Sequence, residues 1–425
     1  MTKTFETAEK KERVILVAVN TEGNDADVET SLEELQELAD TAGAETVGKL
    51  IQRREAIHPG TYVGKGKIQE LADLVRNRQA DAIVCDDELS PAQITNLSET
   101  LQVKVIDRTV MILDIFAAHA RTSEGKLQVE LAQLRYRASR LTGLGKSLSR
   151  LGGGIGTRGP GEKKLEMDRR LIQDRISLLN RQLKEVVQNR DTMRRQRSRS
   201  QIPTVAIVGY TNAGKSTLLN ALTQAEVLEE DKLFATLDPT TRSLEREDGQ
   251  KILFTDTVGF ISKLPHQLVR AFRSTLEEAK YADLILHVVD ASNPHKEHQM
   301  EVVYDTLEAL DITGKPVLTA FNKVDVLSTE PMGGGEILLY ENTGRKDTRS
   351  DASVSISARE GMGLEQLLEK IVKMLDAGFV TIERLFPYEE AGKIQIIRQQ
   401  GRLEVEEYRE DGIFVRASVP PALAH

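Results

Sequence analysis

The stretch GYTNAGKS, from Gly209 to Ser216, has the residue types and spacing of a phosphate-binding loop. It follows the apolar run TVAIV and precedes a segment with helical periodicity, which is the context that such a loop requires. The backbone N–H groups of the loop can surround a β-phosphate, Lys215 can reach the β- and γ-phosphates, and the Ser216 hydroxyl can ligate Mg²⁺. These residues predict a nucleoside triphosphate site.

Two later segments could complete the phosphate and metal site. KILFTDTVGF places Asp256 at the end of an apolar strand, where its carboxylate can hold magnesium through water, and Gly259 can offer a backbone N–H to the γ-phosphate. Between the two elements, FATLDPTTR carries Thr236, Thr240 and Thr241. One of these threonine hydroxyls should complete the metal shell, and the residues alone do not choose among them.

A fourth segment predicts which base is bound. PVLTAFNKVD places Asn322, Lys323 and Asp325 at the end of another strand. The Asp325 carboxylate can accept hydrogen bonds from the ring N–H and the exocyclic amine of guanine, whereas adenine presents an acceptor and a mismatched amine there. The stem of Lys323 can cover the base, and SVSISA, which ends at Ser357 and Ala358, would place a backbone donor beside the guanine carbonyl oxygen. GTP is therefore the predicted ligand.

One position limits the predicted rate of hydrolysis. Many regulatory GTPases follow the glycine of DTVG with a glutamine that orients the attacking water, but here Phe260 follows Gly259. Because an aromatic ring cannot position water by hydrogen bonding, we expect slow hydrolysis by the protein alone and faster hydrolysis when a partner orders the loops or supplies the missing group. Arg242 and Arg270 lie nearby in the chain, but neither can be assigned as an arginine finger.

The elements that precede the loop alternate in period. RVILVAV, ETVGKLIQRR, ADAIVCD and VKVID are typical of strands, and SLEELQELADTA, GKIQELADLVRNR and SPAQITNLSETL are typical of helices. In the last of these helices Ser90 is the predicted N-cap and Pro91 the first helical residue. The order predicts a small α/β subdomain with a largely parallel sheet in residues 1–120.

Residues 121–200 differ in both period and charge. Apolar side chains recur at helical spacing in two runs, Leu127 to Leu141 and Leu165 to Val186, and predict an antiparallel helical hairpin. The segment has 20 Lys and Arg against 8 Asp and Glu, a net charge of +12, so the rest of the chain carries −21 of the total of −9. This asymmetry predicts contact with a polyanion, the alternative being a solvated face balanced by acidic neighbours.

The stretch RLGGGIGTRGPGEKK, from Arg150 to Lys164, lies between the two helical runs and would form the hairpin tip. Glycines let backbone approach a surface closely, Pro160 would restrain the tip, and basic side chains ring it. Such a tip suits RNA recognition by shape and phosphate contact. The predicted RNA-binding residues are Arg150, Gly152, Gly153, Gly154, Arg158, Lys163 and Lys164. MRRQRSRSQIP, which ends at Pro203, would be a basic linker into the next domain.

The remaining segments and the composition complete the predicted α/β multidomain chain. Strand and helix signals alternate through the predicted GTPase domain, residues 201–376, and residues 377–425 predict a small α+β module whose hairpin turns at Glu410, Asp411 and Gly412. The single cysteine, Cys85, lies in the apolar run AIVC and indicates a buried thiol. No apolar run is long enough to cross a bilayer, so we expect a cytoplasmic monomer without membrane insertion, with partial peripheral membrane association left open.

Beyond the GTPase motifs, almost the whole chain from about Gly64 resembles one family. LFATLDPTTR, DTVGFISKLPHQLVRAFRSTLEEAKYADLILHVVD and LSRLGGGIGTRGPGE together resemble the HflX family of ribosome-associated GTPases, in the translation-factor-related class. The resemblance implies the four segments above, binding to the large ribosomal subunit and its rRNA, an approach of the hairpin to the peptidyl-transferase centre, and separation of stalled ribosomes into subunits during stress. It also implies Ser216 and Thr236 as the magnesium ligands.

The predicted site combines these motifs, with GTP, GDP and Mg²⁺ as ligands. Lys215, Thr236 and Gly259 are assigned the catalytic roles, and Ser216 and Thr236 bind the metal, with Asp256 acting through water. The predicted nucleotide contacts are Gly209, Tyr210, Thr211, Asn212, Ala213, Gly214, Lys215, Ser216, Thr217, Phe234, Ala235, Thr236, Leu237, Asp238, Asp256, Thr257, Val258, Gly259, Asn322, Lys323, Val324, Asp325, Ser357 and Ala358.

Three functions are compatible with these residues. The first is a GTP-driven switch that splits ribosomes. The second is a nucleotide-regulated protein that binds or remodels rRNA without separating subunits. The third is a GTP-dependent regulator of a protein partner, with the basic hairpin as its docking face.

Overall fold

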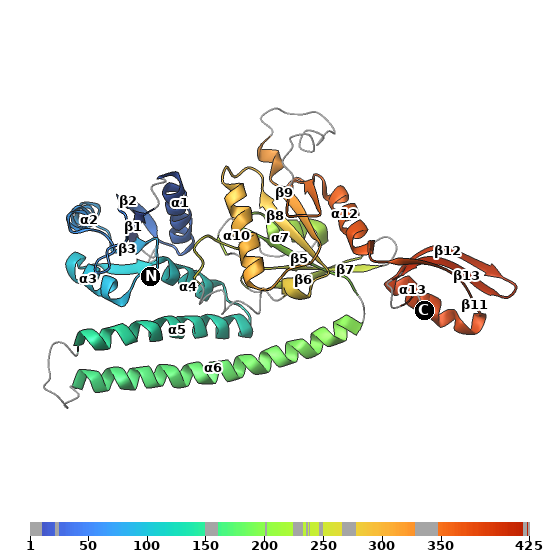
Figure 1. Cartoon of the computed structure of the whole chain (residues 1–425), viewed down its shortest axis with the longest axis horizontal. Helices are drawn as coiled ribbons and strands as arrows, with labels where there is room; N and C mark the ends of the chain where they lie inside the picture. Colours follow the sequence, from blue (N-terminus) through green and yellow to red (C-terminus); the bar gives the residue numbers. More distant parts are fainter. Residues whose placement is uncertain are drawn as a thin grey trace, which may run out of the picture. The chain divides into compact units, whose positions relative to one another are not determined.

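The computed structural model describes residues 11–21, 25–148, 160–199, 202–223, 233–234, 237, 239–245, 250–265, 278–327, 347–419 and 423. The chain divides into two compact units, one of residues 1–185 with 262–272 and one of residues 186–261 with 273–425. Figure 1 shows helices and sheets in each, so the predicted α/β multidomain class is confirmed. None of the described helices is long and apolar enough to cross a bilayer.

The first unit contains a parallel four-stranded sheet in the order β2-β1-β3-β4. Its strands are β1 (Arg13–Asn20), β2 (Glu45–Arg53), β3 (Ala82–Cys85) and β4 (Lys104–Asp107). The helices between them are α1 (Asp25–Thr41), α2 (Lys65–Arg78) and α3 (Pro91–Leu101). The two inner strands, β1 and β3, are apolar because they are buried: every residue of β3 is buried, including Cys85.

Helix α3 begins as its sequence predicts. The Ser90 hydroxyl accepts from the Gln93 N–H at 3.3 Å, the Gln93 side chain accepts from the Ser90 N–H at 2.8 Å, and Pro91 occupies the first turn. This reciprocal pair satisfies two N–H groups that a helix start otherwise leaves without partners. The expected N-cap is confirmed.

A further helix, α4 (Arg108–His119), was not predicted. Its sequence RTVMILDIFAAH is apolar almost all round, and seven of its residues are buried. A helix packed on several sides lacks the amphipathic period by which helices are found in sequence. Asp107, the last residue of β4, caps it by accepting from the Val110 N–H at 3.0 Å.

The predicted helical hairpin consists of α5 (Ser123–Leu148) and α6 (Pro160–Arg199), which run side by side in opposite directions in Figure 1. Leu131, Ile176 and Leu179 are buried in the seam between them. The predicted ends need correction. The loop does not extend to Lys164, because α6 begins at Pro160, a residue that favours the first helical turn. The predicted linker from Met193 is helical as far as Arg199, consistent with the good helix propensity of Arg, Met and Gln.

Helix α5 is anchored to the sheet through Asp107. This carboxylate is fully buried and accepts from the Tyr136 hydroxyl at 2.7 and 2.8 Å, from the Leu89 N–H at 3.0 Å and from Arg140 at 2.5 Å. Burial raises the pKa of Asp107, while Arg140 and the backbone donors oppose that shift. The hairpin therefore starts from a neutralised polar cluster rather than from apolar contacts alone.

The second unit contains a six-stranded sheet in the order β10-β9-β8-β5-β7-β6. Its strands are β5 (Thr204–Gly209), β6 (Thr240–Glu245), β7 (Lys251–Asp256), β8 (Leu284–Asp290), β9 (Val317–Asn322) and β10 (Ala352–Ser355). Only β6 pairs antiparallel among these strands. The helical elements are α7 (Lys215–Thr223), α10 (Lys296–Ala309), the short 3-10 helix η1 (Val324–Val326) and α12 (Leu364–Asp376). Apolar side chains of the central strands pack with those of α7 and α12.

The last part of the chain forms a three-stranded antiparallel sheet in the order β11-β13-β12. Its elements are β11 (Val380–Phe386), the 3-10 helix η2 (Tyr388–Glu390), α13 (Ala391–Gln400), β12 (Arg402–Arg409) and β13 (Gly412–Val419). Arg409 pairs with Gly412 across the turn, so the predicted hairpin at residues 410–412 is confirmed. The strand β11 was not predicted.

Candidate functional site

The predicted phosphate-binding loop joins β5 to α7, at the carboxyl ends of the parallel strands. Its Gly214 has φ +90°, and a Cβ there would lie 2.3 Å from Asn322 Nδ2. The Asn322 amide in turn donates to the Ala213 carbonyl at 2.9 Å. Glycine is required at this position because β9 approaches the loop so closely, and the contact fixes the loop against the strand that carries the base-recognition segment.

Lys215 begins α7 and is only 7% exposed. Its ammonium donates to the Tyr210 carbonyl at 2.8 Å and forms no ion pair with any described residue. Burial lowers its pKa to about 8, with Asp256 opposing the shift and Lys323 adding to it. A buried cation with a single backbone acceptor is poised to gain from an anion, as a phosphate-binding lysine must be.

Ser216 and Asp256 meet beside this lysine. The Ser216 hydroxyl donates to Asp256 Oδ2 at 2.8 Å, and Asp256 is fully buried at the end of β7. A hydroxyl and a carboxylate are the hard oxygen ligands that Mg²⁺ prefers, so this pair fits the predicted metal position. Of the three threonine alternatives, Thr241 has its hydroxyl 2.9 Å from the Thr255 hydroxyl within the β6–β7 pair, and Thr236 lies outside the described residues.

The segment that contains Gly259 is bonded directly to the phosphate loop. The Phe260 N–H donates to the Gly209 carbonyl at 3.1 Å, and the Thr211 N–H donates to the Phe260 carbonyl at 2.8 Å. A Cβ on Gly259 would lie 2.8 Å from Thr211 Cγ2 and 3.1 Å from the Lys215 ammonium nitrogen. Gly259 therefore lies directly beside the Lys215 ammonium, and Phe260 is 1% exposed in the core.

The predicted base-recognition residues gather at the ends of β9 and β10. Asn322 ends β9, Lys323 has a left-handed backbone with φ +63°, and Asp325 lies in η1. The Ala358 N–H, predicted to meet the guanine carbonyl oxygen, here donates to Asn322 Oδ1 at 2.9 Å. The Asn322 side chain thus links the phosphate loop, through Ala213, to the backbone of Ala358.

One residue beside this group was not predicted. Asp290, the last residue of β8, pairs with the Lys323 ammonium at 2.8 Å and also accepts from the Ser292 hydroxyl at 2.6 Å. The sequence carried a signal for it, because LILHVVD ends at the same sheet edge as FN in β9, and Asp290 is in register with Asn322. This ion pair holds the lysine that is predicted to cover the base.

The structure thus brings together the predicted residues of the phosphate loop, the DTVG segment, the NKVD segment and residues 357–358. Phe234 and Leu237 are buried. Several predicted residues fall outside the described ones, namely Ala235, Thr236, Asp238, Arg150, Gly152, Gly153, Gly154 and Arg158. Lys163 and Lys164 lie in the first turns of α6.

Behind the site lies a buried polar cluster that the sequence did not reveal. Asp347 Oδ2 accepts from the Tyr304 and Thr319 hydroxyls, each at 2.6 Å, and lies 3.9 Å from His287 Nδ1. Burial lowers the pKa of His287 to about 4, with Asp347 opposing the shift. The imidazole is therefore neutral near pH 7, and its ring packs edge-on against Tyr304 with centroids 5.1 Å apart.

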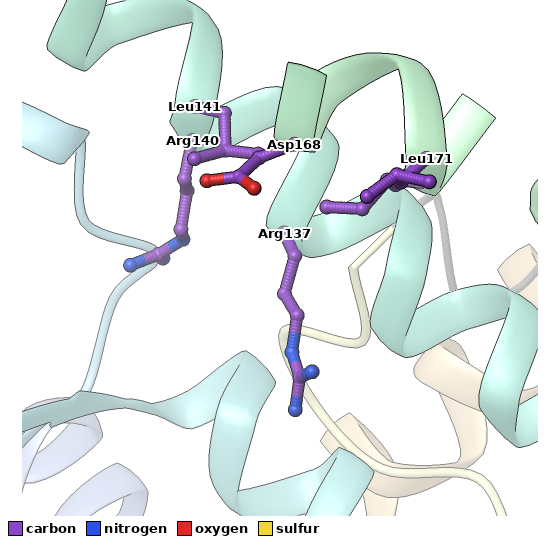
Figure 2. A pocket seen from close by; sticks show the side chains of 6 residues that line it. Arg137, Arg140, Leu141, Asp168 and Leu171 are labelled. Atoms are coloured by element: carbon purple, nitrogen blue, oxygen red, sulfur yellow. The ribbon is translucent and has the colours of Figure 1, made fainter. Parts of the chain in front are cut away.

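The hairpin presents a different kind of surface. Arg169, Arg170, Arg181 and Lys184 on α6 are exposed, and none forms an ion pair with another described residue. Figure 2 shows a hollow in the same hairpin, where Arg137, Arg140 and Leu141 of α5 lie near Asp168 and Leu171 of α6. All of its lining residues belong to the first unit, and none of them is a predicted nucleotide contact.

Three consecutive segments of the chain match families of known proteins. Residues 29–117 match a family described as GTP-binding GTPase N-terminal, residues 119–197 one described as GTP-binding GTPase middle region, and residues 204–323 one described as 50S ribosome-binding GTPase. The GTPase HflX of Lacrimispora saccharolytica is 60% identical over 423 residues, which cover 100% of this chain and 97% of that protein. The GTPase HflX of Escherichia coli is 42% identical and covers 91% of this chain and 89% of its own length. Among solved structures, a GTP-binding protein of Sulfolobus solfataricus in complex with GDP has a TM-score of 0.43 and 24% identity, covering 85% of this chain and 98% of that one.

Proposed function

Because the chain belongs to the HflX family of GTPases, and so binds and hydrolyses GTP, we propose that it does this on the large ribosomal subunit and separates stalled ribosomes into subunits under stress. The observation that carries the proposal is the match of residues 204–323, which include most of the predicted nucleotide contacts, to a family described as 50S ribosome-binding GTPase. We propose four segments: an N-terminal α/β subdomain in residues 1–120, the basic helical hairpin in 121–200, the GTPase domain in 201–376 and a small C-terminal domain in 377–425.

The hairpin is the proposed rRNA-binding element. Its exposed Arg169, Arg170, Arg181 and Lys184 have no acidic partner among the described residues, so they are available to phosphates. The predicted tip residues Arg150, Gly152, Gly153, Gly154 and Arg158, with Lys163 and Lys164, would extend this surface. Each phosphate neutralised adds to the salt dependence of binding.

The proposed chemistry uses the groups around Lys215. The loop N–H groups and Lys215 hold the β- and γ-phosphates, the Gly259 N–H meets the γ-phosphate, and Asp325 and Lys323 select guanine. Ser216 and Thr236 would bind Mg²⁺, with Asp256 acting through water, and the metal would supply positive charge against the phosphate groups. GTP ordering of the segments around Thr236 and Gly259 would favour the ribosome-bound state, and hydrolysis would release it.

The decisive experiment is sedimentation of intact ribosomes with the protein and a non-hydrolysable GTP analogue. The proposal expects material to move from intact particles to free subunits, and to do so with GTP analogue but not with GDP. Binding without separation would instead support an rRNA-binding or remodelling role. Weak, salt-insensitive ribosome binding would support a protein-partner role.

A paired set of variants tests the hairpin separately. Replacing Arg169, Arg170, Arg181 and Lys184 by glutamine should weaken ribosome binding and reduce its salt slope by up to about 4, because each phosphate contact contributes about 0.9 to the slope of log K against log salt concentration. Replacing the exposed Arg76 and Arg78 of α2 by glutamine is the matched control, and GTP affinity should be unchanged in both. Equal losses in the two variants would contradict a role specific to the hairpin.

A further inference from the structure

The group that positions the attacking water is not supplied by the residue after Gly259. The Phe260 backbone is bonded on both sides to the phosphate loop, and its ring is 1% exposed within the core. An aromatic ring held there cannot donate to or accept from water. The function must come from another side chain near the γ-phosphate or from a partner.

Thr211, the third residue of the phosphate loop, lies at that place. Its Cγ2 and Cα would be 2.8 and 2.9 Å from a Cβ on Gly259, and the Lys215 ammonium nitrogen would be 3.1 Å from the same point. Gly259 thus lies close to both the threonine side chain and the lysine. These two groups flank the proposed position of the γ-phosphate from the protein side.

The hydroxyl of Thr211 is also unsatisfied. The residue is 7% exposed, and its Oγ1 is buried without a hydrogen-bond partner among the described residues. By contrast, the Thr257 hydroxyl in the neighbouring segment donates to the Ile207 carbonyl at 2.8 Å. A buried hydroxyl without a partner is unfavourable and rare, so its presence in a loop that binds phosphate points to a partner brought by the ligand.

We propose that Thr211 Oγ1 obtains its partners from the substrate, donating to a γ-phosphate oxygen and accepting from the attacking water after rotation about χ1. A hydroxyl has one donor and two acceptor positions, which suffice for both contacts. The water oxygen then bonds to the γ-phosphorus, the bond from that phosphorus to the bridging oxygen breaks, and the water proton passes to the released phosphate. Thr211 gives up no proton in the net reaction; it positions the nucleophile.

The test compares Thr211→Val, which keeps the shape and removes the hydroxyl, with Thr211→Ser, which restores it. Thr306→Val is the matched control, because its hydroxyl donates to the Val302 carbonyl on α10, outside the nucleotide site. Single-turnover GTP hydrolysis, GDP affinity and the affinity for GDP with aluminium fluoride are measured for each. Thr211→Val should slow hydrolysis by about 100-fold, as loss of one preorganised transition-state contact does elsewhere.

The split between ligands distinguishes catalysis from structure. Thr211→Val should lose affinity for GDP with aluminium fluoride while its GDP affinity and melting temperature stay at the wild-type values, and Thr211→Ser should recover most of the rate. Hydrolysis by Thr211→Val at the wild-type rate, or an equal loss of GDP affinity, would overturn the inference. The inference rests on the proposed γ-phosphate position, which Lys215→Met tests independently: unchanged GTP affinity in that variant would refute the position itself.

Discussion

The sheet of the first unit and the six-stranded sheet of the second unit differ in how they treat buried charged residues at the carboxyl ends of their parallel strands. In the first unit, Asp86 follows β3 and pairs with the buried Arg108 at 2.7 Å, and Asp107 ends β4 and pairs with Arg140 at 2.5 Å. In the second unit, Lys215 has a backbone carbonyl as its acceptor and no ion pair within the described part of the chain. The first edge pairs its buried charges internally, whereas the second edge, beside its Asp290–Lys323 pair, keeps the buried Lys215 cation for an external anion.

This difference shows why topology alone does not identify a site. Both sheets bring polar side chains to the edge where ligands of α/β proteins bind. In the first unit the arginines and Tyr136 turn that edge into an anchor for α4 and α5. In the second, the low pKa of Lys215 reflects a charge that burial disfavours and that phosphate would stabilise.

The largest expected effect comes from breaking the internal neutralisation. Arg108→Met removes the buried cation that pairs with Asp86 and Glu34, and leaves Asp86 with the more exposed Lys263 as its ion-pair partner. We expect the free energy of unfolding of the first unit to fall by about 3–5 kcal/mol, because the buried Asp86 carboxylate loses its buried cation and keeps only the more exposed Lys263. Hydrogen exchange of the β3 and β4 amides would measure it. Unchanged exchange there would remove the basis of the comparison, and GTP affinity serves as the control.

The corresponding change in the second unit should act on binding rather than folding. Lys215→Met should weaken GTP binding by about 100-fold, near 3 kcal/mol, because two charge-assisted phosphate contacts are lost. The free energy of unfolding should not fall, since no buried carboxylate loses an ion pair among the described residues. Nucleotide titration and urea unfolding of the same sample test both statements. A loss of stability comparable to that of Arg108→Met would contradict the contrast.

A pH dependence should distinguish a third buried group, His287. Its folded pKa of about 4 lies below the ordinary value of 6.5, so the unfolded chain binds a proton first as pH falls. The contribution of the neutral imidazole to the free energy of unfolding is fully present above pH 6.5. It is lost progressively as the pH falls to 4, by up to about 3 kcal/mol. Urea unfolding between these pH values should show the slope in the wild type and in His298→Gln, which changes an exposed histidine. The slope should be reduced in His287→Phe, and an undiminished slope would assign it to other groups.

The smallest expected effect concerns the helix cap at the start of α3, in the first unit. Ser90→Ala removes the hydroxyl that accepts from Gln93 and should lower the free energy of unfolding by about 1 kcal/mol. Ser90→Asn should restore most of it, because asparagine also caps helices. Hydrogen exchange at the first turn of α3 is the measurement. If Ser90→Ala lowered the free energy of unfolding as much as Arg108→Met does, the cap would matter as much to the stability of this unit as the buried ion pairs.

The sequence predicted the parts that depend on local pattern. The order of strands and helices in residues 13–107, the Ser90 cap, the hairpin seam and the phosphate loop follow from periodicity and turn chemistry. It missed α4, whose apolar residues face several neighbours at once, and it placed the start of α6 too late. The His287 cluster depends on contacts between segments that are distant in the chain, so no local pattern indicates it, whereas Asp290 was missed although it ends the apolar run LILHVVD.

The buried thiol of Cys85 can be used as a probe for opening of the sheet in the first unit. The side chain is fully buried in β3, and burial raises its pKa well above the usual value, with Asp107, Asp87 and Asp86 adding to that shift. A thiol-specific reagent therefore reacts only with molecules in which this sheet has opened, and the chain holds no second cysteine to obscure the signal. Labelling kinetics can therefore follow the opening of this sheet in the wild-type protein, and nucleotide binding can be measured in the same sample to follow the second unit.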